Sequence, residues 1–225
     1  MNNLIYNTGL LSLIVQVLTG ILDFVVLRMN VPQSLLLLKQ LLMVEFIVQL
    51  VELCFYVWLV FQFSKSDITR FRYYDWFITT PTMLFTLAFY LLYLRYKEEN
   101  KEIPDIRELI KENISTLIPV AILNAVMLFF GYLGEIQQLS KYLSTFLGFI
   151  PFILMFYIIY INYAIFTEDG MKIFFYFSIV WAFYGVAALL PYHLKNSSYN
   201  ILDLLAKNFF GTYLALTLLY ELRNP

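Results

Sequence analysis

Two acidic and two basic side chains interrupt stretches that are otherwise almost wholly apolar. Asp203 and Lys207 lie four residues apart in NILDLLAKNFFGTYLALTLLY, so one helical turn places them on the same face. Arg72, Asp75 and Thr79 in RYYDWFITTPTMLFTLAFY follow at i, i+3 and i+7, again on one helical face. Because charges inside a bilayer are costly and usually mark a pathway or a counter-ion, these residues are the first candidates for a functional site.

The chemistry expected of such a lysine is covalent attachment to a carbonyl compound. A lysine among apolar side chains is a ready Schiff-base former, and the protonated imine needs a carboxylate counter-ion, which Asp75 and Asp203 can supply. The same residues could instead form a structural ion pair that only joins two helices. Trp76, Trp181 and Tyr184 favour the first interpretation, because large flat side chains can hold a flat apolar ligand between them.

The rest of the chain predicts a membrane protein. Its 225 residues are 61% hydrophobic and 14% charged, whereas soluble domains are typically about 45–50% apolar and about 25% charged. The mean hydropathy is +0.72. A membrane-spanning helix needs about 20 mainly apolar residues, and seven stretches qualify: 4–27, 34–63, 70–94, 115–133, 142–166, 172–190 and 200–222. We therefore predict an all-α, multi-pass membrane protein, a seven-transmembrane helix bundle that forms one domain over residues 1–225.

The distribution of Lys and Arg predicts the orientation of this bundle in the plasma membrane or another host-cell membrane. Nine basic residues fall in the loops and helix ends on one side and five on the other, which favours an extracellular N-terminus and a cytoplasmic C-terminus. The first stretch lacks a positive leading region and a cleavage site, so we interpret it as a helix rather than a signal peptide. RYKEENKEIPDIRELIKEN predicts a solvated connector with a short interfacial helix after Pro104.

Composition also excludes several classes of function. A net charge of −1 provides no basic surface for nucleic acid. The single Cys54 cannot form an intramolecular disulfide, and the single His193 cannot build a metal cluster with Cys or His partners. We therefore expect no metal site, and no motif predicts an enzyme.

RYYDWFITTP and DLLAKNFFG resemble two motifs of the microbial (type 1) rhodopsins, in which retinal is bound as a Schiff base to a lysine of the seventh helix. The resemblance covers essentially the whole chain in the number and order of spans. It implies that Lys207 binds all-trans retinal, that Asp75 is the primary counter-ion and proton acceptor, and that Asp203 is the second counter-ion. It further implies that Arg72 guards the extracellular exit and that Thr79 donates a hydrogen bond to Asp75.

The same resemblance implies a retinal pocket and two departures from the family pattern. The implied lining is Trp76, Thr80, Met83, Asn124, Met127, Gly131, Gly148, Trp181 and Tyr184. Gly185 and Ala188 replace a proline and a tryptophan that are usual in the sixth helix, which loosens the far end of the pocket. Thr86 stands where outward proton pumps often keep a carboxylate donor, which argues against a fast pump along that route.

A polar stripe on the second span bears on ion movement. Glu45, Gln49, Glu52 and Tyr56 recur at spacings of four, three and four, which gives one polar face on an apolar helix. Glu45 and Glu52 are roughly 10 Å apart along the axis. Polar side chains also join membrane helices, at about 0.6–2 kcal/mol per contact, so a plain helix interface is an alternative.

This stripe is similar to the glutamate-rich second helix of channelrhodopsins, in which a gate pairs a glutamate with the asparagine after the retinal lysine. Glu52 and Asn208 match that pair, and Ser12 could face the same route. With the short link SKSDIT, the set resembles the rhodopsins of large algal viruses. The resemblance implies a light-gated cation channel. A light-driven outward proton pump with Glu45 as donor, or a sensory photoreceptor, are the alternatives. We expect the lipid bilayer and transported cations or protons as partners, and a homo-oligomer.

Overall fold

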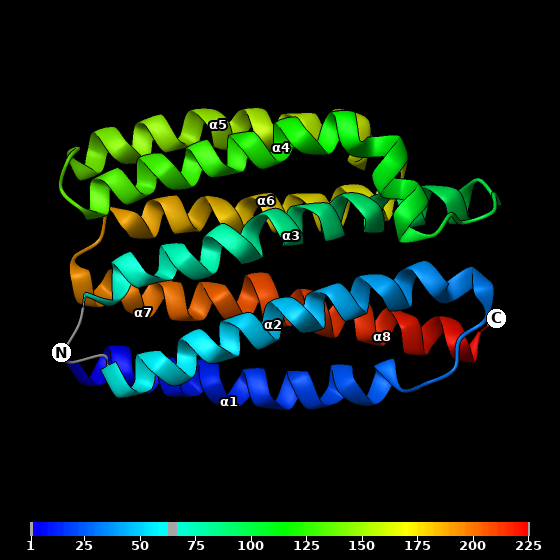
Figure 1. Cartoon of the computed structure of the whole chain (residues 1–225), viewed down its shortest axis with the longest axis horizontal. Helices are drawn as coiled ribbons and strands as arrows, with labels where there is room; N and C mark the ends of the chain where they lie inside the picture. The colour runs from blue at the N-terminus through cyan, green and yellow to red at the C-terminus, as the bar shows by residue number, and fades with distance from the viewer. Residues whose placement is uncertain (1, 63–66, 225) are drawn as a thin grey trace.

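The computed structural model describes residues 2–62 and 67–224, and within these residues every regular element is a helix. Figure 1 shows the long helices running side by side along the longest axis of the molecule, with the two termini at opposite ends. Seven of the segments are long and apolar enough to cross a membrane. The predicted seven-helix membrane bundle is therefore confirmed, while the direction in which it sits in the bilayer stays a prediction.

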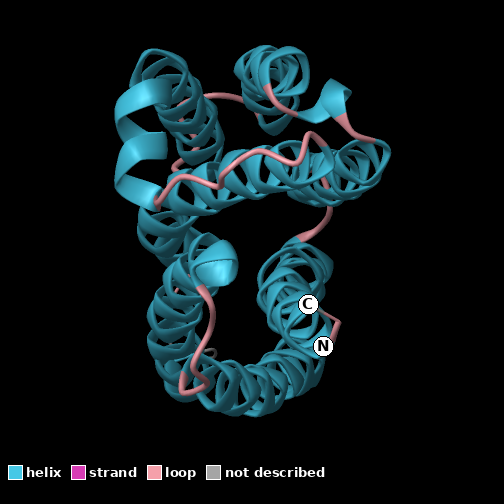
Figure 2. Ribbon diagram, turned by 90° about the vertical axis from the view of Figure 1, so that its right-hand side faces the viewer, coloured by secondary structure: helices cyan, strands magenta, loops and turns pink. Residues whose placement is uncertain are grey.

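The bundle is built from these elements in chain order: α1 (Asn2–Leu27), the 3₁₀ helix η1 (Gln33–Leu35), α2 (Leu36–Gln62), α3 (Ile68–Glu98), α4 (Ile106–Glu135), α5 (Lys141–Asn162), the 3₁₀ helix η2 (Ala164–Phe166), α6 (Glu168–Ala188), α7 (Tyr192–Asp203), the π-helix η3 (Leu204–Asn208) and α8 (Phe209–Arg223). The last three are continuous and form the seventh span. Seen end-on in Figure 2, the long helices lie roughly parallel to one another.

Two predicted spans begin too late in the sequence. The fourth starts at Ile106 rather than 115, and the seventh starts at Tyr192 rather than 200. Asp105 accepts hydrogen bonds from the backbone N–H groups of Arg107 and Glu108 and so begins α4 directly. The segment after Pro104 is therefore the first part of the fourth span, not a separate interfacial helix.

The ends of the other spans differ from the prediction by no more than a few residues. These spans run over Asn3–Leu27, Gln33–Gln62, Ile68–Glu98, Lys141–Phe166 and Glu168–Ala188. Residues 64–66, half of the SKSDIT link, lie outside the described residues, as does residue 63 at the predicted end of the second span.

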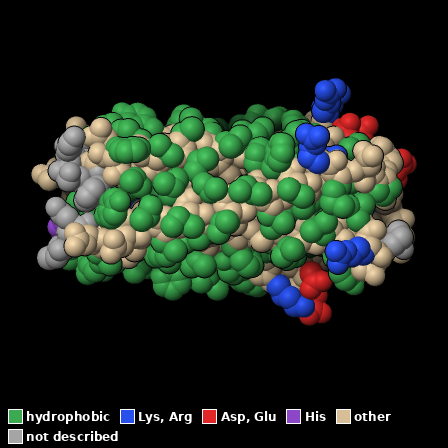
Figure 3. All heavy atoms as spheres, turned by 90° about the horizontal axis from the view of Figure 1, so that it is seen from below, with side chains coloured by type: hydrophobic (Ala, Val, Ile, Leu, Met, Phe, Trp, Pro, Cys, Tyr) green, Lys and Arg blue, Asp and Glu red, His purple; other side chains and the backbone are tan. Residues whose placement is uncertain are grey.

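The surface and the interior of the bundle follow the membrane pattern. On α1, one face carries exposed apolar side chains (Leu11, Ile14, Leu18, Ile21 and Val25) and the opposite face carries the buried Ser12, Gln16 and Asp23. Figure 3 shows the same pattern over a whole side of the molecule: apolar side chains cover its middle, and charged ones gather toward one end. Lipid contact thus explains the apolar exterior, and the buried polar residues of α1, α2, α3 and the seventh span are left facing one another.

Candidate functional site

The Lys207 ammonium lies in the bundle interior within 4 Å of three carboxylates. Its Nζ donates a hydrogen bond to Asp75 Oδ2 at 2.6 Å. Asp203 Oδ1 is 3.8 Å away, and Glu52 Oε1 is 3.7 Å away. Lys207, on η3, is only 2% exposed. Three carboxylates thus surround this buried amine, and Asp75 is the nearest of them.

Asp203 and Asp75 differ in how their oxygens are used. Asp203 Oδ2 accepts from Tyr56 Oη at 2.7 Å and from Arg72 Nη1 at 3.2 Å, while Oδ1 accepts from Tyr184 Oη at 2.7 Å. Asp75 Oδ1 has no hydrogen-bond partner among the described residues. Asp75 thus lies closest to Nζ and keeps one oxygen without a hydrogen bond, whereas both oxygens of Asp203 accept hydrogen bonds.

Arg72 links this cluster to a second layer of amides on α7. Its Nε donates to Asn196 Oδ1 at 3.2 Å, and its Nη2 donates to Asn200 Oδ1. Asn200 in turn donates to Thr8 Oγ1 on α1 at 2.8 Å. The side chain of Arg72 is fully buried. The guanidinium therefore joins α1, α3 and α7 on the side of Lys207 that leads to the N-terminal end of the bundle.

Replacing Arg72 with Gln is expected to destabilise the protein strongly. The substitution leaves the buried Asp203 carboxylate without its guanidinium, and breaking a buried pair in this way costs about 3–5 kcal/mol. Arg70→Gln is the matched control, because Arg70 forms an exposed ion pair with Asp67 that is worth about 0–1 kcal/mol. Thermal denaturation in detergent should show a large loss for the first variant and little for the second; equal losses would contradict the network described here.

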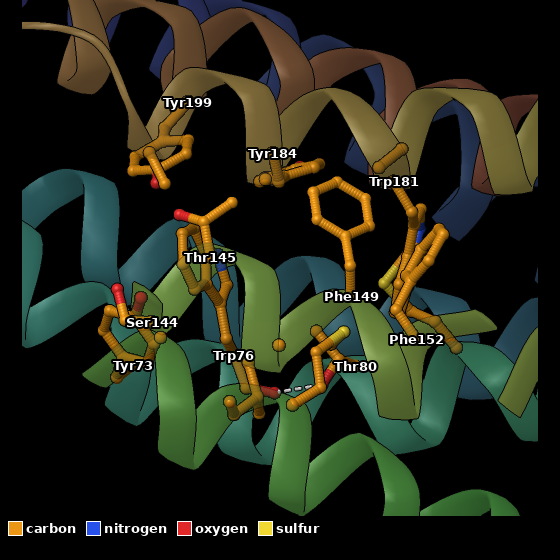
Figure 4. Close-up of a pocket in the computed structure, with 18 of the residues that line it drawn as sticks. Tyr73, Trp76, Thr80, Ser144, Thr145, Phe149, Phe152, Trp181, Tyr184 and Tyr199 are labelled. Atoms are coloured by element: carbon orange, nitrogen blue, oxygen red, sulfur yellow. Dashed lines mark hydrogen bonds between the residues drawn. The ribbon is translucent and has the colours of Figure 1, made fainter. Parts of the chain in front are cut away.

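An apolar cavity extends from Lys207 toward α4 and α5. The predicted residues that line it are Trp76, Thr80, Met83, Met127, Gly131, Gly148, Trp181, Tyr184 and Lys207. Figure 4 shows Trp181 and Tyr184 of α6 on one side of the cavity and Trp76 and Thr80 of α3 on the other, with Phe149 of α5 pointing into the space between them. The cavity is thus a slot between aromatic side chains with an amine at one end.

Asn124, the remaining residue of the predicted pocket, does not line the cavity but hydrogen-bonds to Thr80, which does. Its Nδ2 donates to Thr80 Oγ1 at 2.8 Å, and Thr80 Oγ1 donates to the main-chain oxygen of Trp76 at 2.6 Å. Gly185 and Ala188 also line the cavity, at the positions where the sequence predicts a looser end. A Cβ at Gly185 would come within 2.6 Å of Phe149 Cζ, so this glycine makes room for the Phe149 ring.

The structure bears on two predicted contacts: the hydrogen bond from Thr79 to Asp75 is present, and a hydrogen bond between Glu52 and Asn208 is not. Thr79 Oγ1 donates to the main-chain oxygen of Asp75 at 2.9 Å and not to its carboxylate, because a threonine one turn further along a helix reaches the carbonyl first. Glu52 and Asn208 make no hydrogen bond to each other: Glu52 lies beside Lys207, whereas Asn208 Nδ2 donates to Thr19 Oγ1 on α1 at 2.9 Å.

The remaining residues of the predicted ion route are all buried but have different partners. Ser12 donates to the main-chain oxygen of Asn200 at 2.8 Å, and Gln49 Nε2 donates to Asp23 Oδ2 at 2.5 Å. The carboxylates of Glu45 and Glu52 have no hydrogen-bond partner among the described residues. The polar stripe of α2 therefore faces α1, α3 and the seventh span inside the bundle.

Several residues of the site were not singled out from the sequence. They are Tyr73, Leu128, Ser144, Thr145, Phe149, Phe152, Tyr199 and Ala206 in the cavity, and Thr19, Asn196 and Asn200 in the polar interior. Asn196 and Asn200 stand seven and three residues before Asp203 on the same helical face, a spacing that could have revealed them. The aromatic lining of α5 has no such signal in a segment where nearly every residue is apolar.

Comparisons with known proteins agree with this architecture. The chain matches the family model of the bacteriorhodopsin-like proteins over residues 6–221. Among solved structures, the viral rhodopsin OLPVRII superposes with a TM-score of 0.81 at 28% identity, over 94% of this chain and 96% of that one. No curated protein sequence matches.

Two more distant structures share the fold. A blue light-absorbing proteorhodopsin from Med12 has a TM-score of 0.73 at 21% identity, over 97% of this chain and 98% of that one. Xanthorhodopsin, described as a light-driven ion pump with dual chromophore, has a TM-score of 0.70 at 18% identity, over 96% and 92%. Since the family model accounts for nearly the whole length, the chain belongs to the bacteriorhodopsin-like family, the microbial rhodopsins that act as photoreceptors and ion transporters in membranes.

Proposed function

We propose that this protein is a retinal-binding photoreceptor that acts as a light-gated cation channel. The observation that carries the proposal is the slot between Trp76 and Trp181, which ends at the buried Lys207 amine. A long, flat, apolar aldehyde fits such a slot, and Lys207 would hold it as a Schiff base. When bound, retinal would supply absorption of visible light and a photoisomerisation at the site.

The protein's own part in the reaction begins with a proton. Asp75 Oδ2 is 2.6 Å from Lys207 Nζ, so Asp75 receives the Nζ proton with almost no movement of either side chain. Asp203 is the less available acceptor, because Tyr56, Arg72 and Tyr184 already donate hydrogen bonds to it. Transfer of the proton to Asp75 therefore neutralises one of the carboxylates around Nζ and weakens the forces that hold η3 against α3.

The polar interior of α1, α2 and the seventh span supports conduction. Glu52 beside Lys207 and Glu45 further along α2 are both buried, and their carboxylates have no hydrogen-bond partner among the described residues. The side-chain amide of Gln16 on α1 is also buried and has no hydrogen-bond partner among the described residues. A line of carboxylates and amides with free bonding capacity can replace part of a cation's hydration shell, as acidic residues do in cation channels.

A light-driven outward proton pump is the second candidate. Glu45 favours it, because a buried carboxylate on the far side of the polar interior from Asp203 could return a proton to Lys207 in place of the donor that is missing at Thr86. In this case Asp75 is again the acceptor. The two functions share their first step and differ in whether ions then move against or down their gradient.

Vesicles that contain the protein and retinal separate the two functions. Without any imposed gradient, a pump changes the internal pH under light and a protonophore abolishes the change. A channel produces no change in that condition, but under light it dissipates an imposed sodium or potassium gradient. We expect the second behaviour; light-driven pH change without a gradient would establish the pump instead.

Neutralising the two glutamates of α2 should have different effects. At an effective dielectric constant of about 20, a carboxylate stabilises a cation 10 Å away by about 1.7 kcal/mol, so we expect Glu45→Gln to lower the photocurrent roughly tenfold. Its colour should not change, because no ion pair joins Glu45 to Lys207. Glu52→Gln should lower the current and also shift the absorption maximum, since Glu52 Oε1 is 3.7 Å from Nζ.

Glu112→Gln, at an exposed position of α4, is the control for both variants and should match the wild type. Current recordings on cells with equal amounts of coloured protein measure the first effect, and absorption spectra measure the second. Full photocurrent in Glu45→Gln would remove Glu45 from the conduction route.

A further inference from the structure

A chain of polar contacts leads from the residue after Lys207 to a buried acid on α1. Asn208 Nδ2 donates to Thr19 Oγ1 at 2.9 Å. Thr19 Oγ1 is 3.2 Å from Gln49 Oε1, and Gln49 Nε2 donates to Asp23 Oδ2 at 2.5 Å. We call Thr19, Asp23, Gln49 and Asn208 the inner latch. It ties together α1, α2 and η3, three segments that lie far apart in the sequence.

On α2, the inner latch lies between the two buried carboxylates of Glu45 and Glu52. Gln49 is four residues from Glu45 and three from Glu52, or about 6 Å and 4.5 Å along the helix axis. All three side chains share the polar stripe. Any cation or proton that moves along this stripe from Glu45 to Glu52 must therefore pass Gln49 and its partner Asp23.

Gly211 on α8 leaves room for the contact between Gln49 and Asp23. A Cβ at Gly211 would clash with Gln49 Nε2 and come within 3.0 Å of Asp23 Oδ2. The absence of a side chain there is what lets the Gln49 amide reach Asp23. Gly20 on α1 also faces Gln49, but a Cβ at Gly20 would be 3.9 Å from Gln49 Oε1, an ordinary contact distance.

Asn208 places one end of the inner latch in the π-helix that carries Lys207. Such π segments are rare and occur frequently at functional sites. A displacement of η3 after the Lys207 proton has moved to Asp75 would pull Asn208 away from Thr19. Because Thr19 Oγ1 is also 2.9 Å from the main-chain oxygen of Val15, its hydroxyl has another acceptor when the contact to Gln49 is lost.

We propose that the inner latch is the closed gate of the ion route in the dark, with Asp23 and Gln49 as its sealing pair and Asn208 as its connection to Lys207. The proposal deepens the proposed channel function and rests on it for the light-driven opening. It differs from a gate made by Glu52 and Asn208, which form no hydrogen bond to each other here. The competing interpretation is that these contacts only join three helices.

Gly211→Ala is the sharpest test, because it displaces the end of the Gln49 side chain without removing any polar group. We expect the variant to leak sodium and protons in the dark about tenfold faster than the wild type, equivalent to 1.4 kcal/mol, and to close more slowly after light. Gly20→Ala, which approaches the same side chain with room to spare, should leak and close like the wild type. Dark leak is measured in vesicles with an imposed gradient and a pH- or sodium-sensitive dye.

Gln49→Leu is the second variant, in case Gly211→Ala yields no coloured protein. It keeps a side chain of similar size and removes both contacts of the amide, so it should leak in the dark as well. Wild-type dark leak in both variants, with normal colour, would overturn the inner latch and leave a helix interface.

The dark leak does not depend on the transport mode, so the two proposals can fail separately. If the wild type proves to be a pump, the channel proposal fails while the leak of Gly211→Ala still decides whether the inner latch seals the interior. If the wild type conducts as a channel and Gly211→Ala does not leak, the inner latch alone is wrong.

Discussion

Lys207→Ala is expected to give a colourless protein when retinal is supplied. Lys207 is the amine at the end of the apolar slot, and no other lysine lines that cavity among the described residues. The variant should also lose every light-induced current, since no group remains to transmit the isomerisation to Asp75. Absorption spectra of purified protein measure the colour directly.

Lys195→Ala is the matched control for this experiment. Lys195 forms an ion pair with Glu135 at 2.6 Å on the opposite end of α7 from η3, so its loss should leave the colour unchanged. A coloured Lys207→Ala protein would mean that another residue binds the chromophore, and the site described here would be wrong.

Asp75→Asn is expected to shift the absorption maximum to longer wavelength and to abolish the fast loss of the Nζ proton after a flash. At 2.6 Å and an effective dielectric constant of about 20, the carboxylate stabilises the Lys207 charge by about 6 kcal/mol. Removing it destabilises the charge localised at Nζ and also removes the acceptor. Flash photolysis measures the proton step, and a static spectrum measures the shift.

Asp67→Asn provides the comparison, because Asp67 is exposed and pairs only with Arg70 among the described ion pairs. It should have the spectrum and the flash kinetics of the wild type. An unshifted spectrum and a normal proton step in Asp75→Asn would transfer the acceptor role to Glu52 or Asp203, the other two carboxylates near Nζ.

The number and order of the spans could be predicted from the sequence, because hydropathy measures the apolar surface that a helix presents to lipid. The start of the seventh span at Tyr192 could not. Asn196, Ser197 and Asn200 lower the hydropathy of its first turns, yet all three are buried in the bundle interior. Hydropathy alone assigns such polar residues to a loop, whereas here Asn196 is a partner of Arg72 and Asn200 is a partner of Thr8 on α1.

The helix face on which each functional side chain lies could be predicted as well. Its position along the bundle axis relative to the other helices could not. Helical spacing puts Glu45, Gln49 and Glu52 on one stripe and Asp203 with Lys207 on another. It does not say how far α2 is shifted along the seventh span. That shift, together with the π-helix at Leu204–Asn208, brings Glu52 to Lys207 and turns Asn208 toward Thr19. A one-residue change in hydrogen-bond register within a helix leaves no clear mark in the sequence.

The central claim is that light opens a passive cation route, and whole-cell current recorded against voltage tests it most directly. The measurement uses cells supplied with retinal, steps the holding voltage under illumination, and exchanges external sodium and potassium for a large organic cation. The channel predicts a photocurrent that changes sign with voltage, at a reversal potential that moves with the cation gradient. An outward photocurrent that keeps its sign at every voltage and ignores the cation exchange would contradict the claim and establish a proton pump.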